Sequence, residues 1–99
     1  MASSELNARA RAFSSACRAP SGVRLSAIHH PDLDELWLHY VAPERRLCVS
    51  FADGDERAYA VIRTPERGRI VAYRPIDDIM EAARGELASW PSPTKGTSP

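Results

Sequence analysis

The chain of 99 residues lacks an excess of charge of either sign, because thirteen Lys and Arg residues balance thirteen Asp and Glu residues. Proteins dedicated to nucleic acids usually carry a basic excess, since neutralising phosphates supplies much of their affinity. The neutral total therefore argues against nucleic acid as the main partner. The sequence also lacks any apolar run near the ~18 residues of a membrane span or the ~7–15 residues of a secretory signal core. We therefore expect a cytoplasmic protein that makes no contact with membranes.

Cysteine and glycine are also scarce. The two cysteines, Cys17 and Cys48, are too few for a disulfide framework, and each is expected to be a small buried side chain in a reducing compartment. The five glycines are isolated, so the chain has no glycine-rich loop for phosphate binding. No recognised catalytic motif is present, and we expect a protein that is not an enzyme and holds no cofactor.

The length predicts a single domain, which we place over residues 1–90. Residues 91–99 are rich in Pro, Ser and Thr and are predicted to be a disordered C-terminal tail. Within the domain we predict an α+β fold, in which an N-terminal and a C-terminal helix flank a four-stranded antiparallel β-meander. Residues 23–28 are predicted to be either a short fifth strand at the edge of the sheet or an extended segment that leads into it.

Alternating apolar side chains predict the four strands at residues 36–41, 47–52, 57–63 and 69–74. Asp53-Gly54 is a strong hairpin signal, and Gly68 suits the left-handed position after a type I turn. Short connections make neighbouring strands antiparallel. Both strand faces carry apolar residues, so we expect helices on one face and either a closing sheet or a second protomer on the other.

Two helices are predicted at the ends of the domain. The first runs to about residue 17, because apolar residues recur at helical spacing in Leu6, Ala10, Phe13 and Cys17. The composition of residues 1–18, rich in Ser, Ala and Arg, leaves a targeting segment as the alternative. The second helix is predicted to run from an N-cap at Asp78, with Glu81 in the capping-box position, to about Trp90. Arg84 and Glu86 are predicted to face solvent.

Potential metal ligands are concentrated before and within the first predicted strand. We expect no metal site there, because adjacent residues of an extended chain point to opposite sides, which separates His29 from His30. A metal-dependent binder or enzyme that uses His29, His30, Asp34 and His39 remains the alternative. Cys48 and His39 are predicted to be neighbours across the first hairpin, which we interpret as packing because no local sequence signature supports a catalytic pair.

Four arginines surround the last predicted hairpin, namely Arg63, Arg67, Arg69 and Arg74. Tyr59 and Tyr73 are expected to lie near them. Basic side chains interleaved with aromatic ones can bind single-stranded nucleic acid. The acidic residues of the preceding strands oppose this interpretation, so nucleic-acid binding through this hairpin is a further alternative.

The main hypothesis is a small non-catalytic protein-binding module that acts by stoichiometric surface contact, as an inhibitor, an adaptor or an antitoxin-like regulator. A chain of this length has little room for a pocket of ~300 Å³ or more. Aromatic residues and arginine are enriched at interfaces. We therefore expect the partner-binding residues to be Trp37, Tyr40, Arg67, Arg69, Arg74 and Trp90. Self-association into a homo-oligomer would cover the spare face of the sheet.

Overall fold

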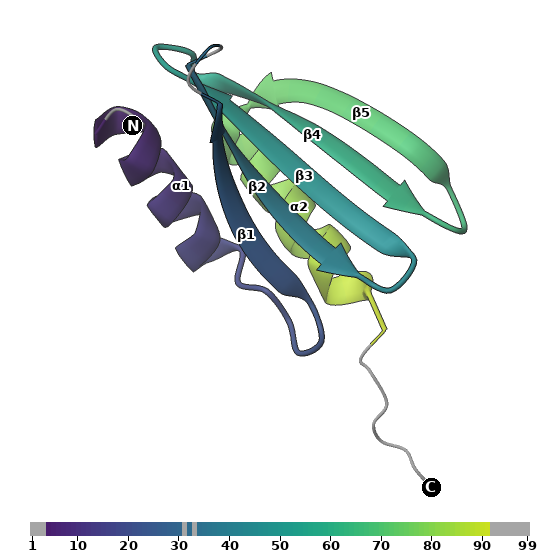
Figure 1. Cartoon of the computed structure of the whole chain (residues 1–99). Coiled ribbons are helices and arrows are strands. Elements are labelled where there is room, and N and C mark those ends of the chain that lie inside the picture. The colour runs from purple at the N-terminus through teal and green to yellow at the C-terminus, as the bar shows by residue number, and fades with distance from the viewer. Residues whose placement is uncertain (1–3, 31, 33, 92–99) are drawn as a thin grey trace, which may run out of the picture.

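The computed structural model describes residues 4–30, 32 and 34–91, which form five strands and two helices (Figure 1). The elements follow the chain as α1 (Ser4–Ala16), β1 (Arg24–His30), β2 (Glu35–Ala42), β3 (Arg45–Ala52), β4 (Arg57–Thr64), β5 (Gly68–Pro75) and α2 (Ile76–Ser89). The predicted tail lies outside the described residues beyond Pro91. Neither described helix is long and apolar enough to cross a membrane.

The five strands form one antiparallel sheet in which every strand pairs with its neighbours in the sequence. This arrangement confirms the predicted α+β meander with a helix at each end. The alternative fifth strand is present, because β1 pairs with β2 along its whole length. Gly54 and Gly68 have positive φ angles of 79° and 69°, as the hairpin turns at these positions require. The sheet does not close on itself, and β1 and β5 are its two edges.

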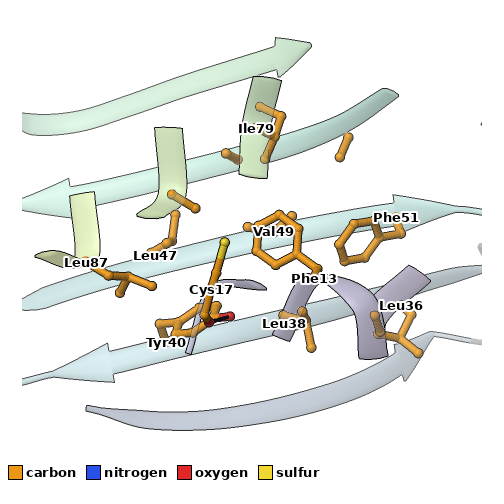
Figure 2. Close-up of a cluster of buried hydrophobic side chains, with 14 of the residues drawn as sticks. Phe13, Cys17, Leu36, Leu38, Tyr40, Leu47, Val49, Phe51, Ile79 and Leu87 are labelled. Carbon is orange, nitrogen blue, oxygen red and sulfur yellow. Dashed lines mark hydrogen bonds between the residues drawn. The ribbon is translucent and has the colours of Figure 1, made fainter. Parts of the chain in front are cut away.

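Both helices pack on the same face of the sheet (Figure 1). Each strand sends alternate side chains toward them, so that successive positions along the strand belong to the core and to the opposite face in turn. Figure 2 shows the resulting core between the sheet and the helices. Its largest members are all nearly inaccessible to solvent, and they are Leu6, Phe13, Leu36, Leu38, Tyr40, Leu47, Val49, Phe51, Ile79, Leu87 and Trp90.

Helix α1 is held by its apolar stripe and by one arginine. The ring of Phe13 meets that of Phe51 on β3 edge to face, with centroids 5.4 Å apart. Arg9 donates hydrogen bonds to the carbonyl oxygens of Ala52 and Asp55 at the β3–β4 connection. The stripe predicted from the sequence is therefore part of the core, and α1 closes one side of it.

Helix α2 begins three residues earlier than the sequence predicts, with its N-cap at Pro75 instead of Asp78. The expected N-cap, Asp78, lies inside the first turn beside Asp77, and Pro75 occupies the cap position without a side-chain hydrogen bond. A side-chain cap is dispensable for the first helical N–H, because Ile76 donates to the carbonyl oxygen of Glu56 at 3.1 Å. The acidic side chains still favour this end of the helix, since they lie near its positive dipole.

The prediction that Glu86 faces solvent is wrong, because the residue is 9% exposed. Its carboxylate accepts a hydrogen bond from the indole nitrogen of Trp90 at 2.8 Å and another from Arg67. Arg67 belongs to the β4–β5 turn, so this contact depends on tertiary packing that helical periodicity does not reveal. Arg84 is exposed as predicted.

Replacing Tyr40 by phenylalanine is expected to lower the free energy of unfolding by about 1–2 kcal/mol. The buried hydroxyl of Tyr40 donates to the carbonyl oxygen of Cys17, and its removal leaves that acceptor unpaired. Urea unfolding followed by circular dichroism measures the loss. Tyr59→Phe is the matched control, because Tyr59 is exposed, and its effect should stay within about 0.5 kcal/mol. Equal stabilities for the two variants would contradict the assigned role of the hydroxyl.

Candidate functional site

The face of the sheet opposite the helices, which we call the uncovered face, has no described element packed on it (Figure 1). Isolated apolar side chains are normal on protein surfaces, but apolar patches often mark binding sites. The uncovered face holds three large apolar side chains that remain about half exposed, namely Ile28 (45%), Tyr59 (48%) and Val71 (48%).

A line of arginines, the arginine row, crosses one end of this face. The strand register places Arg46 directly opposite Arg63 and Arg63 directly opposite Arg69, while Arg24 continues the line on the other side of Val41. No ion pair neutralises these four arginines within the described part of the chain. Because like charges directly opposite each other in a sheet are destabilising, we expect the Arg46–Arg63 and Arg63–Arg69 pairs to lower the stability of the protein.

The charges of the uncovered face are far from balanced. Its strand positions carry five arginines and one acidic residue, a surplus of four positive charges, and these six are Arg24, Arg46, Arg57, Arg63, Arg69 and Glu35. The zero net charge of the whole chain therefore hides a basic surface on one side. Such a surface attracts an anionic partner.

Trp37 is held in a fixed position on β2. Its indole nitrogen donates to the carboxylate of Glu35 at 3.0 Å. The ring of His39 stacks beside the indole, with centroids 6.1 Å apart and planes 16° apart, and the ring of His30 meets it edge to face. The half-buried indole is therefore held by Glu35 and by two histidine rings.

A second aromatic group lies on β4 and β5. The rings of Tyr59 and Tyr73 stack with centroids 4.5 Å apart. The Tyr73 hydroxyl donates to Asp55 at 2.7 Å, and this hydrogen bond raises the pKa of Tyr73 and lowers that of Asp55. The guanidinium of Arg57 lies over the Tyr73 ring at 5.1 Å. Tyr73 is thus fixed from two sides and supports the exposed ring of Tyr59.

Small side chains on the central strand create a hollow between the arginine row and the aromatic groups. Cys48 and Ser50 of β3 are both buried, and the larger side chains of β2 and β4 stand on either side of them. The hollow has a volume of about 270 Å³ and is lined by Trp37, Arg46, Cys48, Val61, Arg63 and Arg69. Half of its lining residues are arginines, and the rest offer an apolar or aromatic surface.

The predicted contact between His39 and Cys48 is present, with the imidazole Nδ1 3.1 Å from the sulfur. Burial, together with the charges of Arg46 and His30, lowers the pKa of His39. Burial also raises the pKa of the Cys48 thiol. Both pKa shifts disfavour the thiolate–imidazolium ion pair that makes a cysteine strongly nucleophilic. Nε2 of His39 has no hydrogen-bond partner among the described residues, so none of them orients the ring as a catalytic base.

The stability of the protein is expected to fall as the pH drops below about 6.5, the value for an unperturbed histidine. The folded state lowers the pKa of His39, so the unfolded chain binds a proton that the folded one resists. His39→Gln should reduce this loss. Urea unfolding at pH 7.5 and 5.5 compares the two proteins, and an unchanged difference between the two pH values in the variant would exclude His39 as its source.

The four weak metal candidates do not converge. His29 and His30 lie on opposite faces of β1, and His29 is on the side of the helices. His39 lies on the uncovered face. Asp34 is in the turn before β2, where its carbonyl oxygen accepts a hydrogen bond from the backbone N–H of Asp53. Within residues 4–30, 32 and 34–91, no three His, Cys, Asp or Glu residues are placed to hold a metal ion.

The residues predicted to bind a partner are scattered by the fold. Trp37 and Arg69 lie on the uncovered face, which makes them members of the candidate site. Tyr40 and Trp90 are buried in the core, so they present no area to a partner. The other two lie elsewhere. Arg67 pairs with Glu86, and Arg74 lies on the helix side of β5, opposite Ala58.

Several members of the site were not singled out from the sequence. Arg24 and Arg46 escaped notice because they belong to strands far from the last hairpin, and only the strand register aligns them with Arg63. Ile28 gave no signal beyond alternation. Counting charges separately for the two faces of each predicted strand would have revealed part of the arginine row.

The fold and the site define a small α+β domain with one helix-covered and one uncovered sheet face. No protein-family model, curated protein or solved structure is significantly similar to the chain.

Proposed function

We propose that the protein is a non-catalytic binding module that acts by stoichiometric contact through the uncovered face of its sheet. The observation that carries this proposal is the half exposure of Ile28, Tyr59 and Val71 on a face where no described element packs. The raised pKa of Cys48 and the lowered pKa of His39 disfavour a thiolate–imidazolium pair, and no described residue orients the His39 ring, so this contact adds no support for catalysis. An inhibitor, adaptor or antitoxin-like regulator would work in this way.

The partner should be acidic, because the strand positions of the uncovered face carry a surplus of four positive charges. A second copy of the chain fits less well than an acidic partner, since it would bring a second arginine row toward the first. We also propose a cytoplasmic location, where Cys17 and Cys48 would stay reduced. Both cysteines are free thiols in the structure.

Two adjacent residues of β5 test which face binds. Val71→Asp adds a negative charge to the uncovered face, whereas Ile70→Asp adds it to the helix side, where Ile70 is 37% exposed. Each tagged protein, with folding checked by circular dichroism, is used to capture partners from a lysate of its native host. We expect wild type and Ile70→Asp to retain the same partner and Val71→Asp to retain at least about tenfold less. Equal retention by both variants, or no partner for wild type, would contradict the proposal.

A further inference from the structure

We propose that the uncovered face binds single-stranded nucleic acid, with the phosphates along the arginine row and a base in the hollow against Trp37. This inference depends on the proposed binding function of that face, and it names the chemical class of the partner. It revises the conclusion drawn from net charge, because the surface that matters is basic although the chain as a whole is neutral.

The arginine row requires an anion with several charges. Arg46, Arg63 and Arg69 occupy successive strands at one register level, so their guanidinium groups repel one another until an anion lies among them. Arginine binds phosphate with paired N–H groups, which a strand of linked phosphates could satisfy one after another. A single small anion would leave part of the row unneutralised.

The aromatic groups supply the second requirement, a flat surface for bases. Tyr59 and Tyr73 stack on each other, and Trp37 is fixed by Glu35, so these rings lose little freedom when a base stacks on them. Stacking on aromatic rings is the usual way in which proteins hold unpaired bases. An acidic protein surface would also neutralise the arginines, but the aromatic rings beside the arginine row add a stacking surface, and arginines combined with such rings are typical of sites for single strands.

The spacing of the two groups suits a nucleotide. Arg63 and Tyr59 are four positions apart along β4, as are Arg69 and Tyr73 along β5, which corresponds to roughly 13 Å in an extended strand. The strip between them is apolar and includes Val61 and Cys48, which line the hollow. Phosphates at the arginine row can thus point their bases across the hollow toward the aromatic rings. Paired bases in a duplex are stacked on one another and cannot reach these rings.

The first test is the affinity of the full chain for a fluorescently labelled 12-nucleotide single-stranded DNA, measured by anisotropy at several salt concentrations. Four phosphate contacts predict a slope of log affinity against log salt of about −2.8, so binding should weaken about 50-fold between 50 and 200 mM salt. The double variant Arg63→Gln/Arg69→Gln should reduce the slope to about −1.4, a loss of about sevenfold over the same range. A slope unchanged from wild type would overturn the proposal.

Arg74→Gln is the matched control for charge. Arg69 and Arg74 both belong to β5 and are both exposed, but only Arg69 lies on the uncovered face. The two single variants change the net charge equally, so a nonspecific effect of charge would weaken binding equally in both. We expect Arg69→Gln to reduce affinity several-fold and Arg74→Gln to leave it nearly unchanged, and equal losses would contradict the assigned face.

Two further probes separate charge from stacking. Tyr59→Ser should weaken the binding of the oligonucleotide by about tenfold, because a stacking platform is lost. An abasic strand with the same number of phosphates should bind wild type at least about tenfold more weakly than the oligonucleotide and should be indifferent to Tyr59→Ser. Equal binding of the two strands would show that only charge is recognised, which would overturn the proposal.

An acidic peptide and a DNA duplex of equal charge complete the experiment. The inference predicts that the single strand binds more tightly than either. Preference for the acidic peptide, together with a captured partner that Val71→Asp loses, would overturn the inference and leave the proposed function intact. If Val71→Asp binds the oligonucleotide and the captured partner as well as wild type does, both the inference and the proposed function are overturned.

Discussion

Replacing Phe13 by alanine is expected to lower the free energy of unfolding by about 3–5 kcal/mol. Phe13 is fully buried, and its edge-to-face contact with Phe51 joins α1 to the central strand of the sheet (Figure 2). The substitution removes that contact and leaves a cavity between the two layers. Since a small domain has a total stability of about 5–15 kcal/mol, this single change should consume a large part of it. Urea unfolding followed by circular dichroism measures the loss.

Two further variants make this prediction decisive. Phe13→Leu keeps most of the apolar volume and should cost only about 1–2 kcal/mol, so it remains measurable if the alanine variant does not fold. Ser15→Ala changes an exposed residue of the same helix and should stay within about 0.5 kcal/mol. A loss below about 1 kcal/mol for Phe13→Ala would mean that α1 contributes little to the core.

Replacing Arg63 by glutamate is expected to have opposite effects on stability and binding. Arg63 stands between Arg46 and Arg69, so the substitution converts two repulsive cross-strand pairs into two attractive ones. The free energy of unfolding should rise by about 1 kcal/mol. The affinity for single-stranded DNA should fall by more than about tenfold, because the centre of the arginine row then repels phosphate. Thermal unfolding and anisotropy measure the two effects on the same sample.

Arg74→Glu is the control for this reversal. Arg74 faces Ala58 across the strand pair and has no directly opposite arginine, so its substitution should bring no comparable gain in stability and little loss of binding. A destabilised Arg63→Glu variant would contradict the electrostatic account of the arginine row. Opposite changes in stability and affinity would show that the row is maintained for a ligand, since functional sites often reduce stability.

The architecture was predictable from local patterns. Period-two alternation located the strands, and the turn signals at Gly54 and Gly68 set the order of the hairpins. The helical stripe of α1 was also visible, because the spacing of Leu6, Ala10 and Phe13 is a local property. The start of α2 was misplaced because a backbone hydrogen bond from Ile76 to the carbonyl oxygen of Glu56, in the β3–β4 connection, replaces the expected side-chain cap.

The site was much less predictable, because it depends on register across several strands. Alternation shows that Arg63 and Tyr59 share a face, but it does not show that Arg46 lies beside Arg63. Residue type also does not distinguish side chains that bind a partner from side chains of the core. Tyr40 and Trp90 have the composition of interface residues, yet the fold buries both against the helices. Net charge was misleading for the same reason, since the acidic residues that balance the chain lie mostly away from the uncovered face.

The most direct test of the central claim uses the two tryptophans of the chain. The indole nitrogen of Trp37 lies on the uncovered face, whereas that of Trp90 is bonded to Glu86 in the helix layer behind the sheet. In a nitrogen–proton NMR spectrum, each indole gives a separate signal during titration with the 12-nucleotide single strand. If the uncovered face binds the strand, the Trp37 signal will shift with added ligand and the Trp90 signal will remain in place. A stationary Trp37 signal at saturating ligand would contradict the claim.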